Sequence, residues 1–188
     1  DVPRFDESVR VVTSDIACSL ALEHWHAARL LLRNGLFPSA VVVHRAQFEA
    51  VLRSIWLLYA ATNDMVAKLG ATLSLDSEQS AKNMPLASVM MEQLSGRAPP
   101  QAVDALLRFK ETSWKALNSY VHAGIHPIRR HGDGTPIKLL GDVLRNANVL
   151  AVLSCMQAAA LSGQQHLQQK VLDLAAQHPT CMPPPLRQ

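Results

Sequence analysis

The stretch from Pro38 to Thr62 carries three charged residues inside an otherwise apolar run. At about 100° per residue, Arg45, Glu49 and Arg53 fall on one face of a helix together with Trp56. Ionised side chains are seldom buried unless they are paired, and the i,i+4 spacing brings Glu49 within reach of both arginines. The stretch therefore predicts a long helix with a partly buried Arg/Glu/Arg ladder, which must face another helix.

Two interpretations of this ladder are open. In the first, the ion pairs set the register of the helix, and loss of one partner leaves an uncompensated charge. If Arg45 and Glu49 are buried together, Glu49→Ala is then expected to cost about 3 kcal/mol or more, whereas a loss below about 0.5 kcal/mol places the ladder on the surface. In the second, Glu49 neutralises one arginine and the other is free to bind a phosphate or a carboxylate.

The composition is that of a globular chain, with 48% hydrophobic and 18% charged residues among 188. This length predicts one domain, which we place at residues 1–178, followed by a proline-rich irregular tail at 179–188. A net charge of +3 is too small for a protein that coats nucleic acid. Intrinsic disorder is excluded for most of the chain, because disorder requires low hydrophobicity and high charge.

Two observations bear on the compartment. The three cysteines, Cys18, Cys155 and Cys181, show no metal-binding or disulfide spacing, which favours a reducing, cytoplasmic location. No apolar run is expected to reach the 18 residues of a membrane span, because charges interrupt the best candidate, and no secretory signal is recognised. We therefore expect a cytoplasmic protein without a membrane partner.

Helical periodicity recurs along the chain and no period of two is found. A first long helix is expected at about 7–33, ending at Asn34-Gly35, and the second begins at Phe37-Pro38, so that the two form a hairpin. Weaker signals predict short helices between residues 63 and 97. Long helices follow from Pro99 to near Pro127 and from Thr135-Pro136 to near Gly163, with a polar extension at 164–178. The predicted fold is all-α, a bundle of four long helices with additional short helices.

A second group of polar residues runs from Ser119 to His131. We expect His122 to hydrogen-bond across to the second helix, and residues 129–136 to form a basic loop with Arg129 and Arg130. His122 and His126 are i,i+4, but zinc needs further ligands in the right places, so no metal is expected. Phosphate-binding and acyl-transfer motifs are absent as well, and we expect no cofactor.

Arg45-x-x-x-Glu49 in one helix and Ser119-x-x-His122-x-Gly124 in a later one together resemble uncharacterised bacterial all-helical families. These families are similar to the HEPN superfamily, which includes RNA-cutting toxins and antiphage defence proteins. The resemblance covers about residues 38–131. It implies an HEPN-like helical bundle, a homodimer, and a polar site of Arg45, Glu49 and His122 with Arg129 and Arg130 beside it.

HEPN ribonucleases are identified by an arginine followed by a histidine after four to six residues, and no such pair occurs here. We therefore predict a binding or regulatory module that takes RNA or a small anion. The ligand-binding residues we expect are Arg45, Glu49, Arg53, Ser119, Arg129 and Arg130. The alternative is a metal-independent RNA-cleaving toxin or antiphage defence ribonuclease, in which His122 or His131 acts as acid or base.

Overall fold

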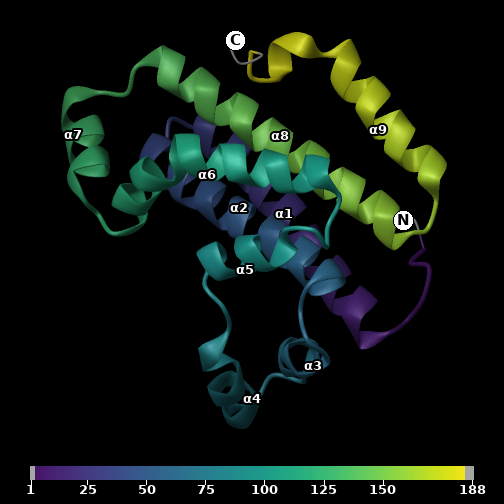
Figure 1. Cartoon of the computed structure of the whole chain (residues 1–188). Coiled ribbons are helices and arrows are strands. Elements are labelled where there is room, and N and C mark those ends of the chain that lie inside the picture. Colours follow the sequence, from purple (N-terminus) through teal and green to yellow (C-terminus); the bar gives the residue numbers. More distant parts are fainter. Residues whose placement is uncertain (1–2, 185–188) are drawn as a thin grey trace.

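A computed structural model describes residues 3–184, and within them the chain is entirely helical, without a strand (Figure 1). The all-α prediction is confirmed. The helices, in chain order, are α1 (Val9–Arg33), α2 (Phe37–Tyr59), α3 (Asn63–Gly70), α4 (Leu75–Ser80), α5 (Ala87–Leu94), α6 (Pro100–Val121), α7 (Ile125–Asp133), α8 (Ile137–Leu161) and α9 (Gln165–Gln177), with 3-10 turns η1 (Ala81–Asn83) and η2 (Pro179–Cys181).

The hairpin of α1 and α2 forms as predicted, because its turn is encoded locally. Gly35 adopts φ +74°, a conformation that glycine takes without strain, and the amide of Leu36 donates to the carbonyl of Leu31. Pro38 lies in the first turn of α2, where a missing N–H costs nothing. The cap of α1 is Ser8, which accepts a hydrogen bond from the amide of Val11.

Helix α2 lies at the centre and packs against α1, α5, α6 and α8. Its side chains Phe48, Leu52 and Trp56 are fully buried, because this helix is apolar around most of its circumference. The Nε2 of Gln47 donates to the carbonyl of Ala147 at 2.9 Å, and residues later in α2 meet residues later in α8. The two helices therefore run parallel, while α1 and α6 run antiparallel to α2.

Small polar side chains join the helices inside the core. The hydroxyl of Ser14 in α1 and that of Ser54 in α2 each donate to the other residue's carbonyl at 2.8 Å. Gln157 of α8 donates from Nε2 to the Ser14 hydroxyl at 3.1 Å, and the Cys18 thiol donates to the carbonyl of Ser154. These hydrogen bonds cross from one helix to another and set the register of α1, α2 and α8.

The region between α6 and α8 differs from the prediction. Helix α6 ends at Val121 and not near Pro127, because Ala123 takes φ +50° and the amide of Gly124 turns back to the carbonyl of Ser119 at 2.7 Å. Much of the predicted basic loop at 129–136 is helical, since α7 continues to Asp133. Pro127 lies in the first turn of α7, where its lack of an N–H is tolerated.

Helix α8 also corrects the sequence expectation about apolar runs. By length and composition it is able to cross a membrane, because alanine, leucine and valine dominate its second half. Within the described part of the chain, however, its polar residues Ser154 and Gln157 are buried and hydrogen-bonded to α1 and α2. These hydrogen bonds attach α8 to α1 and α2.

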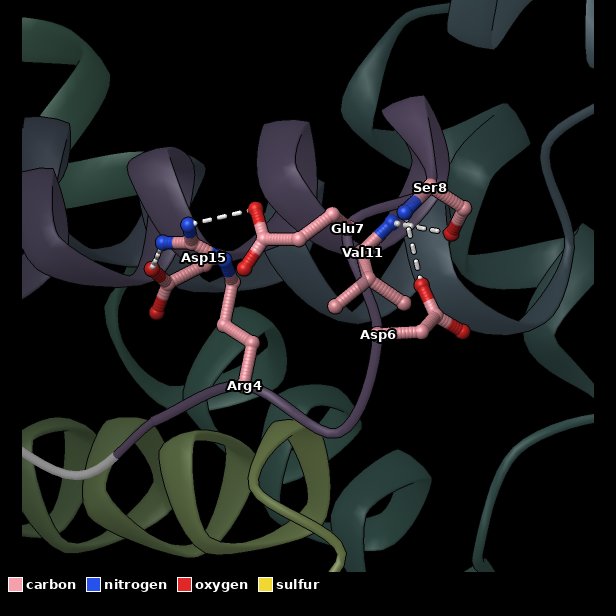
Figure 2. A network of polar contacts seen from close by, with 6 residues as sticks. All are labelled: Arg4, Asp6, Glu7, Ser8, Val11 and Asp15. Atoms are coloured by element: carbon pink, nitrogen blue, oxygen red, sulfur yellow. Dashed lines mark hydrogen bonds and ion pairs between the residues drawn. The ribbon is translucent and has the colours of Figure 1, made fainter.

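Both ends of the described chain pack on the helices. Arg4 reaches Glu7 at 2.8 Å and Asp15 of α1 at 3.0 Å (Figure 2), and the amide of Phe5 donates to the carbonyl of Leu161 at 2.9 Å. At the other end, η2 lies against α8, because Arg145 and Asn148 donate to backbone carbonyls of residues 180 and 181. Residues 185–188 of the predicted tail lie outside the described residues, and the division at residue 178 stays a prediction.

Candidate anion-binding site

Arg45 lies at the centre of a group of polar side chains where α2 meets α6. We call this group, which comprises Arg45, Glu49 and Arg53 of α2 with Asn118 of α6, the polar seam. Its Nε and Nη2 donate to Oε1 of Glu49 at 3.0 and 2.6 Å, and its Nη1 donates to the amide oxygen of Asn118. The guanidinium carbon lies 3.6 Å from the centre of the Trp114 ring. Each of the three nitrogens of this half-buried arginine therefore donates one hydrogen bond, and its charge is paired with Glu49.

Aromatic packing holds Trp114 beneath the guanidinium. Phe48 of α2 contacts Trp114 edge-on, with 5.6 Å between the ring centres, and it stacks on Phe109 of α6, with 4.6 Å between the ring centres. The centre of the His44 ring lies 5.1 Å from the centre of the same Phe109 ring. Because Phe48 and Phe109 are buried, the platform under Arg45 is fixed by the core and not by the surface.

The predicted ladder is only half formed. Glu49 pairs with Arg45, as expected, but no ion pair joins Glu49 to Arg53 among residues 3–184. The carboxylate turns toward Arg45 because that guanidinium is held in place by Trp114 and Asn118. The Glu49 side chain is 46% exposed, against 13% for Arg45, so the pair lies at the edge of the core and not inside it.

Arg53 is the cation that the ladder leaves unpaired. It is half-buried, and its Nη1 is buried with no hydrogen-bond partner in the described part of the chain. Burial lowers the pKa of Arg53, and the nearby Glu49 charge opposes that shift. A guanidinium stays protonated at any physiological pH, so Arg53 carries a charge and an unfilled donor at the same point.

The structure does not bring Ser119 and His122 to the seam. The Ser119 hydroxyl accepts from the amide of His126 at 3.2 Å and so stabilises the turn between α6 and α7. His122 caps the end of α6, is exposed, and its ring makes no hydrogen bond or ion pair with residues 3–184. The residues that face Arg45 are Asn118 and Trp114, which lie one and two turns before His122 in the same helix.

The basic residues of α7 form a separate group. Arg129 pairs with Asp133 at 2.8 Å, both side chains being more than half exposed, and His131 is exposed. Arg130 lies close enough to Tyr120 to lower the pKa of that phenol, although burial raises it by more. The Tyr120 ring stacks on His126. No hydrogen bond or ion pair links the described residues of α7 to the Arg45–Glu49 pair.

No group of three or more metal-ligating side chains gathers anywhere between residues 3 and 184.

Residues 18–184 match a protein family described as a family of unknown function, DUF6988. The chain belongs to DUF6988. No curated protein and no solved structure matches it.

Two further polar residues of this DUF6988 protein lie outside the predicted site. Arg10 of α1 donates to the carbonyl of Ala61 at 2.8 Å and to the side chain of Asn63 at 2.9 Å, so that it caps the end of α2. His44 is 1% exposed, and its Nδ1 lies 3.2 Å from Oε1 of Gln47. Burial lowers the pKa of His44 to about 4, so the ring is neutral at pH 7. Neither residue carries a sequence signal other than its place on an apolar face.

Proposed function

We propose that this DUF6988 protein is a binding module and not an enzyme, and that Arg53 holds a small anion at the polar seam. The observation that carries the proposal is the buried Nη1 of Arg53, which has no partner among residues 3–184. A buried donor without a partner is rare in folded proteins, and an ion or water is the usual reason for one. A carboxylate or phosphate oxygen satisfies such a donor and also pairs with the charge.

The charges of the seam favour this assignment. Glu49 is engaged by Arg45, so that pair is close to neutral, and Arg53 supplies the remaining positive charge. Burial makes that charge costly in the free protein, as the lowered pKa indicates. An anion bound at Arg53 offsets this cost, whereas Arg45 already has Glu49 as its counter-charge.

Titration of the whole protein with inorganic phosphate, followed by calorimetry at low salt, tests the proposal. We expect saturable binding, and a loss of affinity of about tenfold in Arg53→Gln. Arg33→Gln is the matched control, because it removes the same charge from an exposed position at the end of α1. Equal affinity in wild type and Arg53→Gln contradicts the proposal.

The alternative function is a metal-independent ribonuclease, with His122 or His131 as acid or base and with Arg129 and Arg130 holding phosphate. It predicts that the purified protein degrades RNA in the presence of a chelator and that His122→Ala or His131→Ala stops the cleavage. RNA that stays intact at high protein concentration excludes it. In the binding proposal, salt-sensitive association with RNA is weakened by Arg129→Ala and Arg130→Ala without any cleavage.

We also propose that the protein is an HEPN-like homodimer, as the resemblance implies, and that it is located in the cytoplasm. Exposed apolar side chains on α1 support an interface there, since Ile16 is 63% exposed and Leu20, one turn later, is 43% exposed. The free thiol of Cys181 is exposed, which suits a reducing compartment. Light scattering should give twice the chain mass for wild type and the chain mass for Ile16→Glu; a monomeric wild type contradicts the dimer.

A further inference from the structure

A cleft of about 480 Å³ lies between the beginning of α6, the second half of α8 and the first half of α9. Helices α6 and α8 both pack on α2, and the space that remains between them is bordered by Ile55 and Tyr59 of α2. In Figure 1 the first half of α9 extends from the same end of α8. The volume falls in the range of small-molecule sites in proteins, roughly 300–1,000 Å³.

The side chains around the cleft explain why it stays open. Ala102 and Ala105 of α6 face the cleft, and α8 contributes Ala160 besides valine, leucine and methionine. Alanines at these positions are too short to meet across the gap between the helices. No residue that lines the cleft is charged, so an ionic ligand finds no partner there.

Gln157 supplies a hydrogen-bonding group that is directed by the core. This side chain is 4% exposed, and its Nε2 donates to the Ser14 hydroxyl at 3.1 Å and to the carbonyl of Ser54 at 3.4 Å. A carbonyl only accepts, so the Ser54 contact determines which end of the amide points inward. Gln157 lines the cleft, and its Oε1 accepts no hydrogen bond within residues 3–184.

Tyr59 gives the cleft a second polar group. It is half-buried, lines the cleft, and its hydroxyl has no hydrogen-bond partner in the described chain. Gln101 and Gln168 add two more uncharged polar side chains at the edge of the cleft, and the other residues that line it are aliphatic. This combination is typical of a site for a small ligand.

We propose that this cleft binds a neutral, mainly aliphatic small molecule whose hydroxyl or amide N–H donates to Oε1 of Gln157. The aliphatic part contacts the alanine, valine and methionine side chains of α6 and α8, and the Tyr59 hydroxyl contacts the polar end of the ligand. The site is independent of the anion proposed at Arg53, because the cleft involves neither Arg53 nor Glu49.

Calorimetric titration of the full chain with 1-octanol tests the proposal. We expect saturable binding, with about tenfold weaker binding of octanoate, because an uncharged cleft does not compensate a buried carboxylate. Octyl methyl ether keeps the chain but has no donor for Gln157, and it should bind about fivefold more weakly than the alcohol. Absence of saturable octanol binding, or equal binding of alcohol and ether, overturns the proposal.

Variants locate the binding in the cleft. Ala105→Trp fills it and should lower octanol affinity about tenfold, whereas Leu107→Trp introduces the same indole ring at an exposed position of α6 and should leave affinity unchanged. Val152→Phe, which fills the cleft from α8, serves where Ala105→Trp fails to fold. Octanol affinity that is unchanged in a folded cleft-filling variant contradicts the assignment.

Discussion

The guanidinium of Arg45 stacks on Trp114, 3.6 Å from the ring centre, while it also donates to Glu49 and Asn118. One charged side chain of α2 thus makes an aromatic, an ionic and an amide contact, two of them with α6. The contacts with α6 are the ones that depend on the tertiary fold, and they determine how α2 and α6 are aligned.

Replacement of Arg45 should therefore cost more than replacement of a similar arginine elsewhere. We expect Arg45→Gln to lower the free energy of unfolding by about 2 kcal/mol, through loss of the stack and of the bonds to Glu49 and Asn118. Arg29 also lies over a tryptophan, 4.5 Å from the centre of the Trp25 ring, but within its own helix. Arg29→Gln should cost less than about 0.5 kcal/mol in the same urea titration; equal losses contradict the argument.

Removal of Glu49 should be milder than the sequence alone predicts. The carboxylate is 46% exposed, and Arg45 keeps the Trp114 ring and the Asn118 amide when Glu49 is absent, so its charge remains partly stabilised. We expect Glu49→Ala to cost about 1 kcal/mol in chemical denaturation, against about 3 kcal/mol for a fully buried pair. A loss of about 3 kcal/mol contradicts this prediction and indicates that the carboxylate is buried in solution.

Stability should fall in mild acid because of His44. Its pKa is about 4 in the folded protein and 6.5 when unperturbed, so unfolding takes up a proton below pH 6.5. The contribution of the neutral His44 ring to the free energy of unfolding is complete above pH 6.5, and it is lost progressively as the pH falls toward 4. From pH 7 to pH 5 we expect a loss of about 2 kcal/mol from this group.

The comparison with His44→Gln isolates this effect from carboxylate titration. The variant should show a smaller decrease in unfolding free energy over the same pH range, measured by urea denaturation at each pH. Identical pH profiles for wild type and variant contradict a neutral, buried His44.

The three thiols should react at different rates with an aromatic disulfide reagent. Cys181 is exposed and should react first, and Cys155, whose pKa is raised by burial, should follow slowly. Cys18 is 1% exposed with a pKa of about 12, and it should react only when the protein unfolds. Cys181→Ser should remove the fast phase alone; a fast phase that remains in this variant contradicts the order.

Ala123 is a site where glycine should stabilise the fold. Its φ of +50° is unfavourable for a residue with a Cβ, and it ends α6. We expect Ala123→Gly to raise the unfolding free energy by about 0.5 kcal/mol, whereas Ala116→Gly inside α6 should lower it by about 1 kcal/mol. Thermal denaturation of both variants measures the difference, and destabilisation by Ala123→Gly contradicts it.

Much of the helical framework is encoded by neighbouring residues and was therefore predictable. Asn34-Gly35 ends α1, Phe37-Pro38 begins α2, and Gly163, with φ +70°, separates α8 from α9. These signals act over three or four residues, through caps and backbone preferences that do not depend on the rest of the chain. The pairing of Arg45 with Glu49 was predictable for the same reason, since both lie in one helix.

Only the tertiary structure decided which residues face that pair. The sequence predicted His122 across from α2, but α6 presents Trp114 and Asn118, because packing of Phe109 on Phe48 determines the register between the two helices. Glu49 then turns to the fixed Arg45 and leaves Arg53 unpaired. Spacing along one helix determines which side chains are able to meet, but contacts between helices depend on how the whole core packs.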